Sequence, residues 1–164
     1  MTQDIHMEES GDVNITQESV SETIDAKSEY IRLSGFVNAI AKPLASRKIA
    51  KKLYKLIKNA KKAKCLKEGL GDVQKALRKN ETGIVVLAGD VTPIDIYSHI
   101  PAICEDKDIQ YCFTPSRSHL GNVCGRKRAT IVVLVQSHED YETDFNNMNN
   151  MLKELYNEEI VPML

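Results

Sequence analysis

The chain has no tryptophan, three phenylalanines and six tyrosines among its 164 residues. Proteins that bind single-stranded nucleic acid on a sheet surface stack successive bases on several exposed aromatic side chains. So few aromatic residues argue against a stacking platform of that type. Any nucleic-acid binding by this chain would therefore depend on charge, shape and a few base edges.

The sequence also lacks a long apolar segment. No run approaches the ~20 residues that a helix needs to cross a bilayer. The N-terminal stretch MTQDIHMEES is acidic and contains no hydrophobic core. These features predict a soluble intracellular protein with no signal peptide and no membrane partner.

Cysteine motifs are missing too. The four cysteines contain no CxxC pair and no regular spacing: Cys65, Cys104, Cys112 and Cys124. In a reducing compartment such residues are expected to be small buried apolar side chains. A metal site that combines them with His99, His119 or His138 is an alternative with little support from the spacing. We predict no metal and no cofactor.

Catalytic motifs are absent as well. The chain has no GxGxxG after a strand, no GxxxxGK[ST], no GxSxG and no HExxH. Asp90 and Asp95 follow an apolar strand, where α/β enzymes often place catalytic groups, but acidic residues in this position more often serve turns and helix caps. Ser116 and His119 are close in sequence but lack a third partner. We therefore predict that the chain is not an enzyme and has no small-molecule substrate.

What the sequence does contain is a strongly uneven charge distribution. Residues 1–41 carry a net charge of −6, residues 42–81 carry +11, residues 82–137 are neutral, and residues 138–164 carry −6. No acidic residue lies between Arg47 and Lys67, so salt bridges within one helix cannot explain the lysines there. A basic block between acidic ends favours a polyanionic partner.

Hydrophobic periodicity indicates alternating helices and strands. We expect an amphipathic helix from Pro43 through about Ala60, and a glycine-flanked helix after Glu68 that ends at Asn80–Gly83. Continuous apolar runs predict buried strands at residues 83–90, 109–114 and 129–136, with an extended piece near Cys65. Thr92–Pro93 would open another helix. Ser116–Cys124 and an apolar stripe from Phe145 to Tyr156 predict two more.

This alternation predicts one α/β domain with a small sheet between helix layers. We expect an acidic, mostly disordered tail over residues 1–29, the domain over residues 30–158, and a short C-terminal tail over residues 159–164.

The stretch EGLGDVQKAL, Glu68–Leu77, carries the main functional signal. A helix N-terminus offers free backbone N–H groups and positive potential, which attract phosphates. Glycine lets the backbone approach a ligand closely, because no Cβ stands in the way. Asp72 could accept hydrogen bonds from base amino and imino groups, although it would also suit the helix dipole. The loop CGRKRAT at residues 124–130 adds three consecutive basic side chains.

These features together predict an RNA- or DNA-binding surface. Its candidate residues are Lys48, Lys52, Lys67, Gly69, Gly71, Asp72, Lys75, Arg78, Lys79, Arg126, Lys127 and Arg128. A separate surface at Ile94, Tyr97 and Pro101 is a candidate contact for protein partners.

The stretches LKEGLGDVQKALRKN, GDVTPID and PSRSHLG make the sequence resemble the kink-turn RNA-binding family that includes several large-subunit ribosomal proteins. The resemblance runs from about Tyr30 to Gln136. It implies a three-layer α-β-α sandwich with a mixed four-stranded sheet. It also implies that RNA is bound by the loop and helix start at Gly69–Lys75 and by the loop at Cys124–Thr130.

One position departs from the pattern G-x-N-E-x-x-K that typical kink-turn binders have here. Gly69 matches the glycine, Asp72 the glutamate and Lys75 the lysine, but Gly71 stands where asparagine is expected. The loss of that amide weakens base-specific readout and leaves the phosphate contacts, which do not distinguish sequences. We therefore expect RNA binding of low intrinsic specificity.

Within the family, the closest resemblance is to the RNA-binding core subunit of eukaryotic H/ACA ribonucleoproteins. It implies a non-catalytic role in rRNA pseudouridylation and ribosome biogenesis in the nucleus and nucleolus. The partners would be box H/ACA guide RNA and a dyskerin-type pseudouridine synthase with its small accessory subunits. Two alternatives stay open: a sequence-specific kink-turn reader of box C/D, spliceosomal or ribosomal particles, and a basic protein-interaction module.

Overall fold

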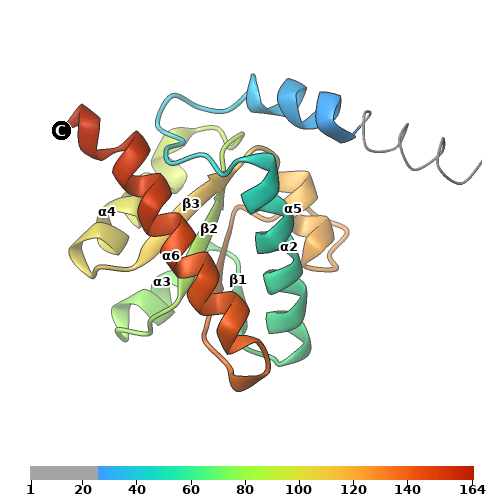
Figure 1. The fold of residues 1–164 in the computed structure, drawn as a ribbon, viewed down its shortest axis with the longest axis vertical. Coiled ribbons are helices and arrows are strands. Elements are labelled where there is room, and N and C mark those ends of the chain that lie inside the picture. The colour runs from blue at the N-terminus through green and yellow to red at the C-terminus, as the bar shows by residue number, and fades with distance from the viewer. Residues whose placement is uncertain (1–25) are drawn as a thin grey trace, which may run out of the picture.

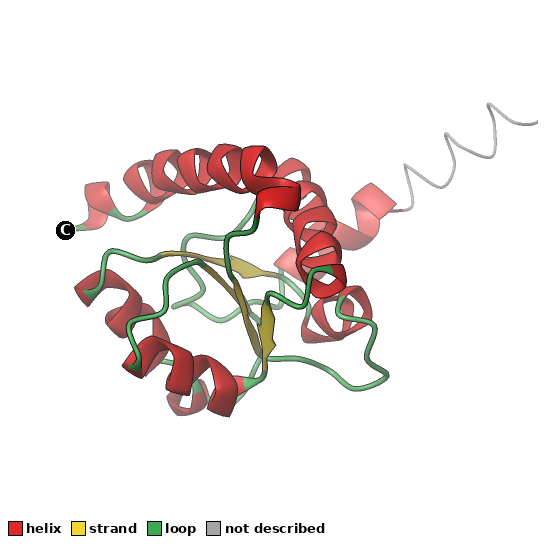
Figure 2. Ribbon diagram, turned by 90° about the horizontal axis from the view of Figure 1, so that it is seen from below, coloured by secondary structure: helices red, strands yellow, loops and turns green. Residues whose placement is uncertain are grey.

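A computed structural model describes residues 26–164 and forms three layers, with helices on both faces of one sheet (Figures 1 and 2). A helix over residues 26–34 comes first. The further helices are α2 (Arg47–Lys62), α3 (Leu70–Arg78), α4 (His99–Asp106), α5 (Arg117–Val123) and α6 (Glu142–Glu159). The strands are β1 (Leu66–Glu68), β2 (Ile84–Ala88), β3 (Gln110–Thr114) and β4 (Val132–Val135), and short 3-10 turns occupy Ile94–Ile96, Glu139–Tyr141 and Val161–Met163.

The sheet is mixed and has the order β1-β4-β2-β3. β4 pairs antiparallel with both β1 and β2, whereas β2 and β3 are parallel. The two central strands, β2 and β4, are buried along their whole length, as their continuous apolar runs predict. The expected α/β sandwich with a mixed four-stranded sheet is therefore confirmed.

The helices divide between the two faces. α2 packs against α5 and α6 on one face, and α3 packs against α4 on the other (Figure 2). The stripe along α2 that buries Ile49, Leu53 and Ile57 is the predicted apolar face of this helix. β1 and β3 form the two edges of the sheet, and α3 contacts β1 and β4, away from the β3 edge.

Two predicted helix starts are wrong. α2 begins at Arg47 and not at Pro43, because residues 43–45 are extended and pair with the edge of β3. The N–H of Phe113 donates to the Pro43 carbonyl at 2.9 Å, and the N–H of Ala45 donates to the Phe113 carbonyl at 2.9 Å. Ser46 then caps the helix, with its Oγ accepting from the N–H of Ile49.

The second wrong start is at Thr92–Pro93. Pro93 leads only into the 3-10 turn Ile94–Ile96, and α4 begins at His99. The end of α3 is as expected, because Asn80 adopts a left-handed conformation (φ 60°) just beyond the helix.

The helix over residues 26–34 includes residues 26–29, which the sequence assigned to the acidic tail; the rest of that tail lies outside the described residues. Tyr30 of this helix donates a hydrogen bond to the Ala45 carbonyl, so the helix is attached to the sandwich. Within residues 26–164, no helix is long and apolar enough to cross a membrane.

Candidate nucleic-acid interface

The start of α3 has backbone donors for which residues 26–164 supply no acceptor. Gly69 has φ 91° and ψ 154°, a conformation open essentially only to glycine, and provides no side-chain cap. Its N–H donates to the Val132 carbonyl at 3.0 Å, which anchors the turn to β4. The N–H groups of the first helical turn have no acceptor within the helix. Such groups at a helix start can donate to an anion such as a phosphate.

An exposed basic stripe continues from this end of α3. Gly71, Lys75 and Arg78 are spaced four and three residues apart, so they lie on one side of the helix, away from its buried residues. Lys79 is exposed next to them. A Cβ added at Gly71 would meet no atom within 4 Å, so the structure leaves open space where the resemblance expects an asparagine.

A second segment, more than 50 residues away in sequence, lies beside the start of α3. Residues 125–129 form an exposed loop that begins with Gly125 in a left-handed conformation (φ 71°). The N–H of Arg126 donates to the Gly121 carbonyl at 3.0 Å, which ties this loop to α5. The tertiary structure thus brings the two segments that the sequence singled out to one side of the molecule.

Glu68 joins the two segments. Its carboxylate lies 3.1 Å from the Lys61 ammonium at the end of α2 and also forms an ion pair with Arg126. The Glu68 side chain is only 10 % exposed, whereas those of Lys61 and Arg126 are 43 % and 58 % exposed. The sequence prediction missed Glu68. Its isolation was a usable signal, because Glu68 is the only acidic residue in the sequence between Arg32 and Gly71.

This ion pair changes the role of the predicted cations. Arg126 is partly neutralised and positions the loop, whereas Lys127 and Arg128 are exposed and form no ion pair within residues 26–164. Lys67 is exposed on β1, one residue before Glu68. Lys67, Lys75, Lys127 and Arg128 are therefore the cations best placed to meet phosphates near the start of α3.

Lys48 and Lys52 lie elsewhere. Lys61 follows Lys52 by nine positions. An α-helix turns by about 100° per residue, so the two side chains lie on opposite sides of α2. The Lys52 Nζ lies 3.7 Å from the Met151 Sδ of α6. The structure therefore does not bring these two predicted residues to the interface at α3.

The predicted surface for protein partners needs one correction. Tyr97 is completely buried, because its ring packs edge-on against Phe113 with centroids 6.0 Å apart. Its hydroxyl accepts a hydrogen bond from the Asn38 side chain at 2.8 Å. Ile94 and Pro101 are half-buried. Tyr97 is thus a core residue and not a contact for a partner.

Two residues considered for catalysis, Asp90 and Ser116, have structural roles. The Asp90 carboxylate accepts from the N–H of Arg117 at 2.9 Å, and the Ser116 Oγ accepts from the N–H of His119, so both cap α5. Burial raises the pKa of the Cys104 and Cys112 thiols to about 12 and that of Cys124 to about 11. Residues 26–164 contain no group of three or more histidine, cysteine or acidic side chains that could hold a metal ion.

The fold and this surface define a class of protein: a small α-β-α domain in which a glycine-started helix lies beside an exposed basic loop. The model of the ribosomal protein L7Ae/L30e/S12e/Gadd45 family matches residues 51–144. The chain belongs to this family, which confirms the resemblance seen in the sequence.

Several proteins in this family are similar over most of the chain. A Drosophila melanogaster protein named H/ACA ribonucleoprotein complex subunit 2 is 50 % identical over 147 residues, which are 89 % of this chain and 86 % of the relative. The Bos taurus protein of the same name is 46 % identical, over 71 % of this chain and 76 % of its own. Among solved structures, a Giardia lamblia 15.5kD RNA binding protein matches with a TM-score of 0.69 and 27 % identity, over 73 % of this chain and 99 % of that one.

Proposed function

We propose that this chain is the non-catalytic RNA-binding core subunit of a box H/ACA ribonucleoprotein. In that role it would hold guide RNA while a dyskerin-type pseudouridine synthase and its small accessory subunits modify ribosomal RNA in the nucleolus. The names of the relatives at about 50 % identity support this assignment. The observation that carries it is the exposed start of α3 at Gly69, with the Lys127–Arg128 loop beside it.

The geometry suggests how RNA would be held. Phosphate oxygens accept hydrogen bonds from the free N–H groups of the first turn of α3, and Lys75 and Arg78 continue the contact along the helix. The Asp72 carboxylate is exposed beside this turn and can accept from a base edge. Because Gly71 offers no amide, most of the affinity would come from phosphates and would fall as the salt concentration rises.

Gly71 also distinguishes this proposal from the alternative of a sequence-specific kink-turn reader. A reader of that kind needs an amide to contact the bases, and this chain has only a hydrogen atom at that position. Specificity for particular RNAs would therefore come from the partner proteins that bind the same hairpin.

Affinity purification of the full chain from nuclear extract, with sequencing of the bound RNAs and identification of the bound proteins, tests the proposal. We expect box H/ACA hairpin RNAs together with a pseudouridine synthase. A variant in which Ala replaces both Lys75 and Arg78 should recover less RNA than the unchanged chain, because two direct contacts to phosphates are removed. Recovery of box C/D, spliceosomal or ribosomal kink-turn RNAs without a pseudouridine synthase would contradict the proposal and support the alternative.

A further inference from the structure

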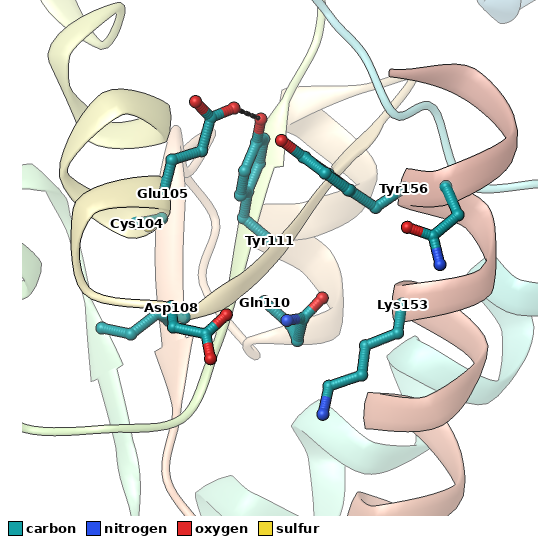
Figure 3. Close-up of a pocket in the computed structure, with 9 residues that line it drawn as sticks. Cys104, Glu105, Asp108, Gln110, Tyr111, Lys153 and Tyr156 are labelled. Atoms are coloured by element: carbon teal, nitrogen blue, oxygen red, sulfur yellow. Dashed lines mark hydrogen bonds between the residues drawn. The ribbon is translucent and has the colours of Figure 1, made fainter. Parts of the chain in front are cut away.

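The edge of the sheet formed by β3 lies at the opposite end of the strand order from β1 and holds a cavity of about 330 Å3. The cavity lies between α4 and α6 and is lined by Glu105, Asp108, Gln110, Tyr111, Lys153 and Tyr156 among others (Figure 3). Nothing in the proposed RNA contact uses this site. We call it the β3-edge cleft.

Tyr111 lines this cleft and is 5 % exposed, and its backbone is unpaired on the side of β3 that points away from β2. The N–H and C=O of Phe113 point away from β2, since both are bonded to residues 43–45, and the Thr114 carbonyl points toward β2, where it accepts from Gly89. Because backbone groups alternate along a strand, the N–H and C=O of Tyr111 point outward like those of Phe113. Within residues 26–164, neither group has a hydrogen-bond partner on that side.

The chain itself shows that this edge accepts another strand. Leu44 forms a parallel bridge with Phe113, and the N–H of Leu44 donates to the Glu159 carboxylate of α6 at 3.0 Å. The chain leaves the edge at Pro43, so the pairing stops one step before Tyr111. The cleft therefore begins where the chain's own edge segment ends.

The side chains around the cleft favour a positively charged occupant. Glu105 and Asp108 lie on its α4 side, and Lys153 faces them from α6 (Figure 3). Lys107 is directed away, because its Nζ donates to the Asn80 side chain at 2.6 Å. Two carboxylates against one ammonium would repel a phosphate backbone and attract a lysine or arginine.

Aromatic rings add a surface for such a side chain. The Tyr111 ring packs edge-on against Tyr156, with centroids 6.3 Å apart, and its hydroxyl donates to Glu105 at 2.7 Å. Tyr156 remains partly exposed. A guanidinium or ammonium beside this ring and the Glu105 carboxylate would gain both cation–π and ionic contacts.

We infer that the β3-edge cleft binds an extended, positively charged segment of a partner protein by strand addition. The backbone of the segment pairs with the N–H and C=O of Tyr111, and one of its basic side chains lies between Asp108 and Tyr156. Main-chain bonds provide affinity in this mode of binding, and pockets for alternate side chains provide selectivity. Since RNA would bind at α3 and β1, the chain can hold RNA and this segment at the same time.

Photo-cross-linking tests the inference. Asn157 lines the cleft and is exposed, so it is replaced by the photoreactive residue p-benzoylphenylalanine. The full chain that carries this residue is purified together with its partners and irradiated. The cross-linked segment is identified by mass spectrometry and synthesised as a peptide. We expect one basic segment of another protein. A cross-link to RNA, to a second copy of this chain or to an acidic segment, or no cross-link, would overturn the inference.

Binding of that peptide to the free chain is then measured by calorimetry. Asp108→Asn should weaken binding about tenfold, whereas Asp106→Asn, an identical change outside the cleft, should not. N-methylation should abolish binding only at the one peptide residue whose N–H pairs with the Tyr111 carbonyl, because Phe113 is already bonded to residues 43–45 and the Ile109 N–H to the Cys104 carbonyl. Equal effects of the two variants, or the same effect of N-methylation at every peptide residue, would overturn strand addition. Affinity for a hairpin RNA is measured on the same samples and should be unchanged by Asp108→Asn. The RNA measurement tests the proposed function and the peptide measurement tests the cleft, so the failure of one can be told from the failure of the other.

Discussion

The Glu68 carboxylate lies 3.1 Å from the Lys61 ammonium and also forms an ion pair with Arg126. One nearly buried acid therefore connects the end of α2, the end of β1 and the loop at residues 125–129. The Lys61 ammonium further donates to the Cys124 carbonyl, at the start of the same loop. The position of the basic loop beside α3 depends on these contacts.

Replacement of Glu68 by Gln should alter both stability and RNA binding. The free energy of unfolding should fall by about 1 kcal/mol, a modest loss because both cationic partners are largely exposed to solvent. Affinity for hairpin RNA at low salt should rise, with a log–log salt slope steeper by about one unit, because Arg126 is released. Urea unfolding and fluorescence anisotropy at several KCl concentrations measure these effects. The exposed Glu158→Gln is the control, and an unchanged salt slope in Glu68→Gln would contradict the prediction.

Gly71→Asn should restore base readout. The open space at Gly71 accommodates the side chain, and the amide should raise discrimination in favour of a kink-turn RNA over a plain hairpin by about 1–3 kcal/mol. Gly71→Ala is the matched control, since it changes the backbone preference without adding an amide. Competition binding with the two RNAs measures the ratio. An equal ratio in both variants would refute the role assigned to this position.

Gly69→Ala and Gly71→Ala should change stability in opposite directions. Alanine at Gly69 must adopt φ 91°, so the free energy of unfolding should fall by about 1–3 kcal/mol. Alanine at the exposed helical Gly71 should raise it by up to about 1 kcal/mol. Urea midpoints of the two variants provide the test. A loss of stability in both would show that Gly71 has a packing role absent from this structure.

Two pairs of basic residues should differ in their contribution to RNA binding. Alanine at both Lys127 and Arg128 should lower the log–log salt slope by about two units, because two phosphate contacts are lost. Alanine at both Lys48 and Lys52 removes the same charge from the α6 side of α2 and should leave the slope nearly unchanged. Similar losses in the two double variants would mean that RNA also covers α2.

Alkaline conditions should destabilise the fold. Burial raises the pKa of the Cys112 thiol from 9.0 to about 12, so the unfolded chain loses this proton at a lower pH than the folded chain. The stabilisation is complete below pH 9 and declines as the pH rises toward 12, by about 1.4 kcal/mol per pH unit for one thiol. Urea midpoints under reducing conditions between pH 8 and 10.5 measure this decline. Cys112→Ala should make the decline shallower by the share of one thiol, because the buried Cys104 and Cys124 thiols remain. Cys65→Ala, at a half-buried position, serves as the control.

Much of the fold could be predicted from local patterns. The continuous apolar run at residues 84–88 indicated a strand buried on both faces, and the three- and four-residue spacing along α2 indicated its buried stripe. The predicted start of α2 failed because Pro43–Ala45 are held by β3, about 70 residues away in sequence. The burial of Tyr97 was also missed, because its contact with Phe113 of β3 forms only when the 3-10 turn that precedes α4 packs against the sheet.

The sequence by itself determined the elements of the sandwich, the glycine-started helix at Gly69 and the basic character of the chain around it. These are local properties, since periodicity, glycine and charge act over a few residues. Only the tertiary structure decided which cations meet at α3, because ion pairs such as Glu68–Arg126 and the direction of Lys52 depend on how distant segments pack. It also decided that Tyr111, which is only 5 % exposed, lies on an edge strand and lines a cleft, since a strand edge exists only once the order of the sheet is set.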